Sequence, residues 1–357
     1  MGCGNKTACL QSVTMEQIID PVSVDLIKAE LTPEKKLCDT NKGGNEIYVI
    51  DVFDSPNTLR EVGRLREIAY RDAGGCSGLS MDIDEFDTME NPYKQIIIWS
   101  PETESIIGGY RYILGPDVKF KPDGQPYLAT AHQFHFSEKF IREYLPYTIE
   151  LGRSFVVPDY QSSRAGARSI FALDNLWDGI GAVMMQHPKI MYFFGKMTMY
   201  TTYDKSCRAL ILHFLWKHFG DKEELIRPHR EEVYDVDPRL LDLILKDEEY
   251  KPDYRNLKEA IRRLGSTIPP LINAYMNSSP TMKMFGTAIN DELENVEDSG
   301  ILISFDEMYA DKRDRHKAPY IRHIFSKMKK RFPDLKEEII EKISLRQDRL
   351  REKNRKR

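Results

Sequence analysis

The order of strand-like and helix-like segments is the feature that most restricts the fold of this 357-residue chain. A β-branched run at 46–52 precedes a helix-spaced segment at 57–73, which ends at the glycine-rich GGCSG motif. Two strand-like runs at 95–100 and 104–114 follow, joined by the polar PETE link, and predict an antiparallel hairpin. Strands and helices then continue to alternate without an internal repeat. This order predicts an α+β fold.

The later segments extend the same order to the end of the body. Residues 147–157 form a strand-like run, and residues from about 165 to 186 have helical apolar spacing. The next predicted elements are a short strand at 192–199, an apolar helix at 206–219 and two further strands within 282–290 and 299–309.

Composition divides the chain into three parts. Residues 1–45 mix charge, Gly and Asn without sustained periodicity, and we interpret them as a leader with one short helix around 24–31. Residues 46–310 form the predicted folded domain, which carries a strongly charged helical insertion at about 221–265. Residues 311–357 form a basic helical tail.

The basic tail has two interpretations. Its thin apolar stripe and its excess of Lys and Arg suit a helix that lies on an anionic membrane surface or meets an acidic partner such as acyl carrier protein. It also suits an ordinary solvated terminal helix. A nucleic-acid partner is not expected, because the basic residues are confined to one end of the chain and no aromatic-interleaved groove motif is present.

The sequence also limits localisation and metal content. No apolar run approaches the roughly 18–20 residues of a membrane-spanning helix, and the first residues lack the apolar core of a secretory signal. Lys6 stands where N-myristoylation asks for Ser or Thr. The cysteines form no C-x-x-C pair, and no histidines are suitably placed to bind zinc. We therefore expect a cytoplasmic protein without a metal or a resident cofactor. Its basic tail is the candidate for peripheral binding to the inner face of the membrane.

Charged residues inside apolar strand runs are the first candidates for chemistry. Glu150 and Arg153 lie in TIELGRSFVV, where a buried charge costs several kcal/mol unless it is paired or used. Gly152, between them, suggests a bulge or the close approach of a ligand. Arg111 repeats the pattern in IIGGYRYIL, where pairing across strands is the alternative.

An acidic run follows the GGCSG loop. The segment MDIDEFD contains Asp82, Asp84, Glu85 and Asp87. On its own it is typical of a surface loop or a weak cation site, since it lacks the Gly and the distal Glu of an EF-hand loop.

Together these motifs resemble a known family. The order of LREIAY, DEFD, IGGYR, ELGR and STIPPLINAY is similar to that of the bacterial ornithine- and glycine-lipid N-acyltransferases, long labelled hemolysin-like, which are related to the acyl-homoserine-lactone synthases. The likeness spans roughly residues 47–308. It implies a GNAT-like, mostly antiparallel central sheet flanked by helices, with an acyl thioester bound where strands splay and an acyl carrier protein as the usual donor.

The resemblance assigns the family's motif positions to this chain. They are Arg66 and Tyr70 in the wall that faces the amine and acyl groups, the paired acids Asp84 and Asp87, the hairpin arginine Arg111, and Glu150 with Arg153 in the E-x-x-R strand.

The chemistry of amide formation suggests a role for each group. An ammonium group must lose a proton before it attacks a thioester, and Glu150 is the candidate base. Backbone N–H groups from Gly152 to Ser154 would stabilise the charge on the thioester oxygen. Arg153 and Arg111 would bind the substrate carboxylate, held in turn by the two aspartates.

One motif departs from the acetyltransferase pattern. The usual Q/R-x-x-G-x-G/A phosphate loop is replaced by QSSRAGAR at 161–168, which has shifted spacing. A carrier-bound phosphopantetheine with its single phosphate is therefore easier to accommodate than coenzyme A. Arg164 and Arg168, together with Gly152 and Ser154, are the candidate contacts to the donor, and a surface role is the alternative for the two arginines.

The sequence therefore predicts an N-acyltransferase that moves a 3-hydroxy fatty acyl group to the amino group of a small amino acid, glycine or ornithine, in amino-acid lipid synthesis. No GxSxG elbow and no Cys–His pair is marked out, so direct transfer is expected. The alternatives are a signal synthase similar to the acyl-homoserine-lactone enzymes and a non-catalytic lipid- or carrier-binding protein.

Overall fold

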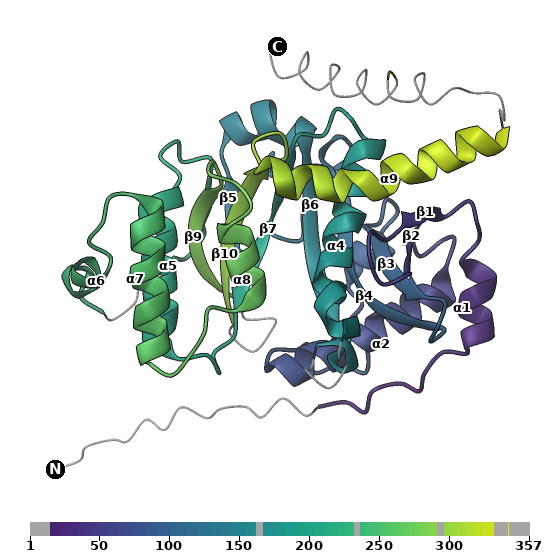
Figure 1. The fold of residues 1–357 in the computed structure, drawn as a ribbon, viewed down its shortest axis with the longest axis horizontal. Coiled ribbons are helices and arrows are strands. Elements are labelled where there is room, and N and C mark those ends of the chain that lie inside the picture. The colour runs from purple at the N-terminus through teal and green to yellow at the C-terminus, as the bar shows by residue number, and fades with distance from the viewer. Residues whose placement is uncertain (1–14, 162–166, 232–235, 291–295, 332–341, 343–357) are drawn as a thin grey trace.

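An eight-stranded sheet runs through the centre of the protein in the computed structural model, which describes residues 15–161, 167–231, 236–290, 296–331 and 342 (Figure 1). All neighbouring strands are antiparallel except β6 and β7, which are parallel. In spatial order they are β1 (Lys36–Asp39), β2 (Glu46–Ile50), β3 (Lys94–Ser100), β4 (Ser105–Leu114), β6 (Thr148–Val156), β7 (Tyr192–Met199), β10 (Val296–Ser304) and β9 (Lys283–Asn290). The α+β, mostly antiparallel architecture confirms the expected fold class.

Helices cover both faces of this sheet. Ile96 and Ile98 of β3 pack in one cluster with α4 (Ala167–Gln186), whereas Ile97 packs in another with α2 (Pro56–Ala73). This division follows from the alternation of side chains along a strand. The long helix α9 (Ala310–Arg331) packs against α4 and crosses it (Figure 1).

The remaining elements surround this core. The helices α5, α6 and α7 stand beside the β9 edge, and the short α8 lies near β10 (Figure 1). Their bounds are α1 (Val24–Glu30), α3 (Glu85–Thr88), α5 (Lys205–Phe219), α6 (Pro238–Ile244), α7 (Tyr250–Arg263) and α8 (Pro270–Met276), with a small separate ribbon of β5 (Phe134–Phe136) and β8 (Ile226–Pro228).

The ends of α2 show how local sequence sets a helix. Ser55 is its N-cap and Pro56 its first residue, but the Ser55 side chain makes no capping bond. The carboxylate of Glu30 instead accepts the N–H groups of Asn57 and Thr58 at 3.0 and 2.7 Å. The Glu30 carboxylate, from the preceding helix, thus caps the unpaired N–H groups in the first turn of α2. Such a cap from a distant residue cannot be recognised from the sequence around the helix. At the other end Gly74 takes a left-handed conformation with φ of 86°.

The domain boundaries drawn from composition need correction. The stretch taken as a leader contributes β1 to the main sheet, and α1 packs against α2. The tail was expected to begin at 311, yet α9, which spans Ala310–Arg331, packs on α4 and β1 and buries His316, Lys317 and Pro319. These segments lack strong hydrophobic periodicity because their apolar side chains pack against elements that are distant in sequence.

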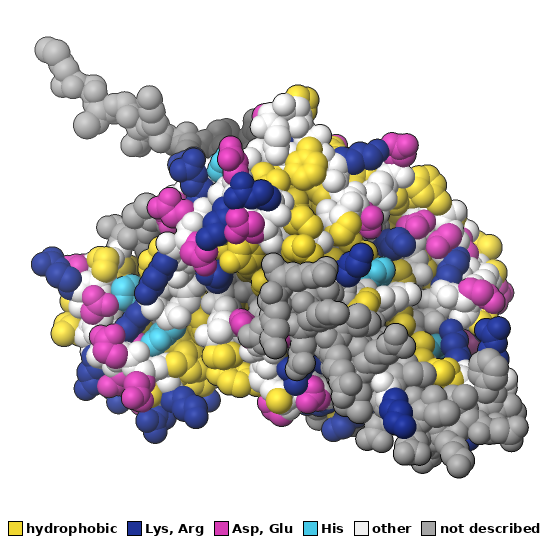
Figure 2. All heavy atoms as spheres, turned by 90° about the horizontal axis from the view of Figure 1, so that it is seen from above, with side chains coloured by type: hydrophobic (Ala, Val, Ile, Leu, Met, Phe, Trp, Pro, Cys, Tyr) yellow, Lys and Arg dark blue, Asp and Glu magenta, His cyan; other side chains and the backbone are white. Residues whose placement is uncertain are grey.

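The part of the tail that prompted the lipid hypothesis lies mostly outside the described residues. Figure 2 shows acidic and basic side chains interspersed on the face seen from above, rather than gathered into a patch of one sign. Within the described ranges, no helix has the length and apolar character needed to cross a membrane.

The α4–α9 contact depends on a glycine. A Cβ atom at Gly181 of α4 would stand 2.4 Å from the carbonyl oxygen of His316 in α9. A side-chain contact reinforces the crossing, because His316 Nδ1 lies 2.7 Å from Asp178 Oδ1. The same carboxylate also accepts, at 2.8 Å, the N–H of Asn41 in the segment between β1 and β2. The helices therefore meet with backbone against backbone.

We expect Gly181→Ala to destabilise the protein. Alanine favours an isolated helix by about 1 kcal/mol over glycine, but here it must displace the α9 backbone, and such overpacking costs about 1–3 kcal/mol. Urea unfolding should therefore show a net loss of stability, while Gln186→Ala, at an exposed position of the same helix, should leave it nearly unchanged. A Gly181→Ala protein as stable as the parent would contradict the close contact.

Candidate active site

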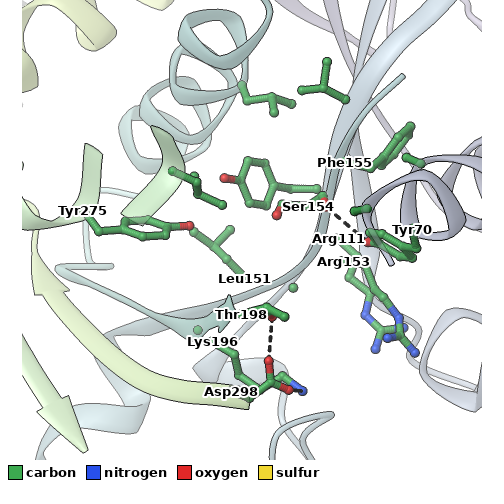
Figure 3. Close-up of a pocket in the computed structure, with 18 of the residues that line it drawn as sticks. Tyr70, Arg111, Leu151, Arg153, Ser154, Phe155, Lys196, Thr198, Tyr275 and Asp298 are labelled. Atoms are coloured by element: carbon green, nitrogen blue, oxygen red, sulfur yellow. Dashed lines mark hydrogen bonds and ion pairs between the residues drawn. The ribbon is translucent and has the colours of Figure 1, made fainter. Parts of the chain in front are cut away.

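The sheet opens between its two parallel strands. Pairing of β6 with β7 runs from Thr148↔Tyr192 to Leu151↔Gly195 and goes no further. Beyond that point β6 continues beside β4, and β7 continues beside β10. Figure 3 shows this opening with Leu151 at its closed end. The splayed strands predicted from the sequence are thus present.

A bulge in β6 lies at the mouth of the opening. Gly109 of β4 pairs with Phe155 and Arg111 pairs with Gly152, so β6 has one extra residue across this step. The extra turn falls at Arg153, whose φ of 47° is left-handed. A non-glycine residue held in this region costs about 1–3 kcal/mol and persists only where its surroundings enforce it.

Gly152 is not required sterically for this bulge. A Cβ atom placed there would meet only the Arg111 side chain, at 3.6 Å or more. The prediction of a bulge near Gly152 is therefore correct, but the strained residue is its neighbour. The space in front of Gly152 remains open to a ligand.

A cavity of about 820 Å³ passes through the opening and has two chemically different parts. On the α4 face it is apolar, lined by residues such as Leu176, Trp177, Ile180 and Tyr275. On the opposite face it is polar, and Glu150, Arg111 and Lys196 line it. Because alternate residues of β6 and β7 point to opposite faces, one opening gives access to both parts.

Arg66 is a buried member of an arginine–aspartate cluster. Its side chain is fully inaccessible, and its guanidinium donates to Asp87 at 3.1 and 3.2 Å and to Gln95 Oε1 at 3.0 Å. It is not among the residues that line the cavity, whereas the resemblance placed it in the wall that faces the amine and acyl groups. Tyr70, one helical turn along, does line the cavity and donates its hydroxyl to Ser154 O at 3.2 Å.

The aspartates of the acidic run hold the other arginines. Asp84 Oδ1 accepts from Arg111 Nη1 at 2.6 Å and Asp84 Oδ2 from Arg153 Nη2 at 3.1 Å. Asp87 adds a bond to Arg111 at 3.2 Å. Asp84 and Asp87 also form the capping box that starts α3, so a single turn orients both carboxylates. Two acids of the run are thus bound by arginines, and Asp82 and Asp87 are buried rather than exposed on a surface loop.

Charge pairing sets the protonation of this cluster. Burial alone would raise the pKa of Asp87, but the charges of Arg66 and Arg111 overcome it and hold the pKa far below its usual range. The same balance lowers the pKa of Asp84, through Arg111 first and Arg153 after it. Both carboxylates are therefore ionised, and their charges neutralise the guanidinium groups beside them. In the part of the chain that the structure describes, the Nε atoms of Arg66, Arg111 and Arg153 are buried without a hydrogen-bond partner.

Glu150 is the buried carboxylate of the polar part. It is 3% exposed, accepts the N–H of Thr130 at 3.2 Å on Oε1, and accepts the hydroxyl of Tyr93 on Oε2. Burial raises the pKa of Glu150, and the hydrogen bonds from Thr130 and Tyr93 only partly oppose this. A carboxylate with a raised pKa is better matched to proton transfer near neutral pH.

The predicted pair Glu150 and Arg153 does not form a direct contact within the described residues. Arg153 points instead to Asp84 and Asp82, and Arg111 is the cation whose charge acts on Glu150. The bulge causes this difference, because it changes the direction of the side chains after Gly152.

The predicted donor contacts are only partly described. Gly152 and Ser154 line the cavity. Arg164 lies outside the described residues. Arg168 lies in the first turn of α4, and its side chain lies outside them as well.

Sequence reasoning missed Tyr93, Thr130, Lys196 and Asp298, all of which line the cavity. Lys196 and Asp298 carry the signal that singled out Glu150, a charge inside an apolar strand run, in FFGKMTM and VEDSGILI. Tyr93 and Thr130 carry no local signal, because loops bring them to Glu150.

Comparisons with known proteins agree with this geometry. Residues 65–169 match the acetyltransferase (GNAT) domain family. The chain is 58% identical to a glycine N(alpha)-acyltransferase of Bacteroides thetaiotaomicron and 56% identical to that of Phocaeicola vulgatus, over 86% of this chain and 91% and 94% of those proteins. It is 30% identical to an L-ornithine N(alpha)-acyltransferase of Rhizobium meliloti over 48% of this chain and 49% of that one.

A solved structure of a CoA-dependent acyl-homoserine lactone synthase shows a distant likeness, with a TM-score of 0.33 and 13% identity over 78% of this chain and 90% of that chain. This likeness is too remote to indicate function.

We expect Asp87→Asn to destabilise the fold by about 3–5 kcal/mol at pH 7, because it leaves buried guanidinium charge uncompensated. The folded-state pKa of Asp87 is lowered, so its contribution is complete above the unfolded pKa of about 4 and is lost as pH falls toward the folded value. The difference in free energy of unfolding between parent and variant, measured in urea, should therefore become smaller below about pH 4. The exposed, ion-paired Asp39 is the control; Asp39→Asn should cost less than about 1 kcal/mol. A gap that stays constant down to pH 2 would show that Asp87 is not the ionised partner.

Proposed function

Because the chain belongs to the family of bacterial glycine and ornithine N-acyltransferases, we propose that it transfers a fatty acyl group from a carrier thioester to the amino group of glycine. The donor is a 3-hydroxyacyl acyl carrier protein and the product an early intermediate of amino-acid lipid synthesis. The high identity to two glycine N(alpha)-acyltransferases over most of the chain favours glycine above ornithine as the acceptor.

The reaction is a direct acyl transfer. The amine nitrogen attacks the thioester carbonyl carbon, a C–N bond forms, the C–S bond breaks and the donor thiol is released. The ammonium form must first lose a proton, and the attacking nitrogen loses a second one as the amide forms.

The position of Glu150 carries the proposal. It is a buried carboxylate beside the closed end of the β6–β7 opening, on the polar face of the cavity. Tyr93 and the Thr130 amide fix its two oxygens. Its raised pKa makes it a stronger proton acceptor than an exposed glutamate.

The backbone of β6 supplies the electrophilic assistance in this proposal. From Gly152 onward the strand no longer pairs with β7. Its N–H groups on that edge are then open to the amides and the carbonyl oxygen of a bound thioester arm, as preorganised donors.

The apolar part of the cavity accounts for a fatty rather than an acetyl donor. Side chains of α4 and α8, including Trp177 and Ile272, line this part together with Ile303 of β10. A volume of about 820 Å³ for the whole cavity exceeds the needs of two carbon atoms. Burying each methylene of a longer chain is worth about 0.8 kcal/mol.

Arg111 and Arg153 take a different role in this proposal from the one that the resemblance implied. Their guanidinium groups are already bound by aspartates. They are thus positioning residues that hold the bulge and the wall of the polar face, and the substrate carboxylate needs another partner.

One assay tests the function as a whole. We expect the purified protein to release thiol from a 3-hydroxyacyl carrier protein only when glycine is present, and to form N-acylglycine detectable by mass spectrometry. Release without an amine would indicate a hydrolase, and a lactone product would indicate a signal synthase. Absence of any turnover with carrier-protein and coenzyme A donors would indicate a binding protein.

A variant tests the base. Glu150→Gln keeps the size of the side chain but cannot accept the proton, and we expect kcat to fall by roughly 10²–10⁴-fold. The parent rate should rise with pH as Glu150 ionises, through a pKa above the usual glutamate range, and the variant should lose this limb. Glu143→Gln, at an exposed ion pair, is the matched control. Near-parental turnover of Glu150→Gln across pH would refute the assignment.

A further inference from the structure

A second charged cluster lies in the same cavity, on β7 and β10. Asp298 is fully buried and accepts from Lys196 Nζ at 2.9 Å, Thr198 Oγ1 at 2.5 Å, Asn290 Nδ2 at 2.8 Å and Gln133 Nε2 at 3.1 Å. Burial alone would raise the pKa of Asp298, but Lys196 and these hydrogen bonds lower it, so the carboxylate is ionised. Figure 3 shows Lys196, Thr198 and Asp298 on the side of the opening opposite Arg111 and Arg153.

Lys196 is the member of this cluster that can reach a ligand. Its side chain is 19% exposed and lines the cavity. Its Nζ donates to Gln133 Oε1 at 2.5 Å and to Asp298. An ammonium group has three N–H donors, so one remains for a ligand beyond these two partners within the described ranges.

The cations of the cavity wall differ in how far they are neutralised. Arg111 and Arg153 each contact two aspartate carboxylates. Lys196 contacts one carboxylate, Asp298, whose charge is shared with three neutral donors. Of these three lining cations, Lys196 is thus the one whose charge is balanced by the fewest carboxylates, and this favours it as the partner of an anionic ligand.

Strand geometry places Lys196 close to the base. Glu150 is the register partner of Phe194, and Lys196 follows two residues later on the same face. From the strand spacing and rise, the Cα atoms of Glu150 and Lys196 are about 8 Å apart. Their side chains therefore flank a space suited to a small molecule rather than contacting each other.

One turn orients both groups. Thr130 donates its N–H to Glu150, and Gln133, three residues later, binds both Lys196 and Asp298. The turn at 129–133 thus holds the base and the cation in fixed relation. A substrate with an amine at one end and an anion at the other fits this arrangement.

We propose that Lys196 binds the carboxylate of the acceptor amino acid, with Asp298 and Gln133 as positioning residues, so that the amino group is directed at Glu150. This inference rests on the proposed function. It makes Lys196 a determinant of the preference for amino acids over simple amines, and it explains how the acceptor is held although both arginines of the cavity are engaged.

The test compares two acceptors. Steady-state kinetics with one acyl donor are measured for glycine and for glycinamide, which lacks the carboxylate. In Lys196→Met we expect KM for glycine to rise by about 10–100-fold, the value of one hydrogen bond between charged groups. For glycinamide the change in KM should be less than about 3-fold, because glycinamide has no carboxylate for the Lys196 ammonium to bind. Lys196→Arg should retain part of the preference for glycine.

Two further variants keep the test decisive. Lys196→Met leaves the buried charge of Asp298 without its cation, which can destabilise the fold. The double variant Lys196→Met with Asp298→Asn removes both charges and so avoids an unpaired buried carboxylate. Lys283→Met is the matched control, because Lys283 is a half-buried lysine of β9 paired with acids and absent from the cavity wall.

Each outcome has one meaning. Equal losses for glycine and glycinamide in a folded Lys196 variant would overturn the carboxylate assignment. Loss of preference in Lys283→Met would overturn it as well. If the parent protein acylates neither glycine nor another amino acid, the proposed function fails, and that result appears before any variant is made.

Discussion

The site depends on ion pairing between arginines from three separate elements and aspartates from one short segment. Arg66 comes from α2, Arg111 from β4 and Arg153 from β6, and the acids at 82–87 bind all of them. None of these charges could be buried alone, since an unpaired one costs several kcal/mol. Pairing therefore fixes how α2, β4 and β6 lie against one another. It also maintains the left-handed conformation of Arg153, from which the bulge arises.

The bulge and the parting of β6 from β7 create one passage with two environments. Alternation along the strands sends Leu151 and Phe193 to the apolar face, and Glu150 and Lys196 to the polar one. A fatty chain and a zwitterion have incompatible solvation needs, and under the proposed function the sheet separates them. The reacting carbonyl would then lie at the point where β6 and β7 divide, from which the cavity extends to both faces.

The polar face is arranged as a set of neutralised pairs rather than as a field of one sign. Asp87 and Asp298 are ionised because cations lie beside them, whereas Glu150 has no such close partner and its pKa is raised. Carboxylates in and beside one cavity thereby differ: Asp87 and Asp298 are held ionised by neighbouring cations, and Glu150 is the one that the proposed function assigns to proton transfer. The difference comes from the local surroundings and not from residue type.

The sequence by itself determined the α+β order, the hairpin, the strand at 192–199 and the helix that follows it, and it marked Glu150, Arg111 and the acids at 84 and 87 as candidates. These features depend on short-range periodicity and on charges inside apolar runs, and both can be recognised within a short stretch of sequence. Only the tertiary structure decided that Arg66 is buried away from the cavity, that Arg153 turns to aspartates, that Tyr93 and Thr130 hold Glu150, and that residues 36–39 belong to the sheet. Each of these depends on contacts between segments far apart in the chain, and such contacts leave no period in the sequence because their partners are brought together only by folding.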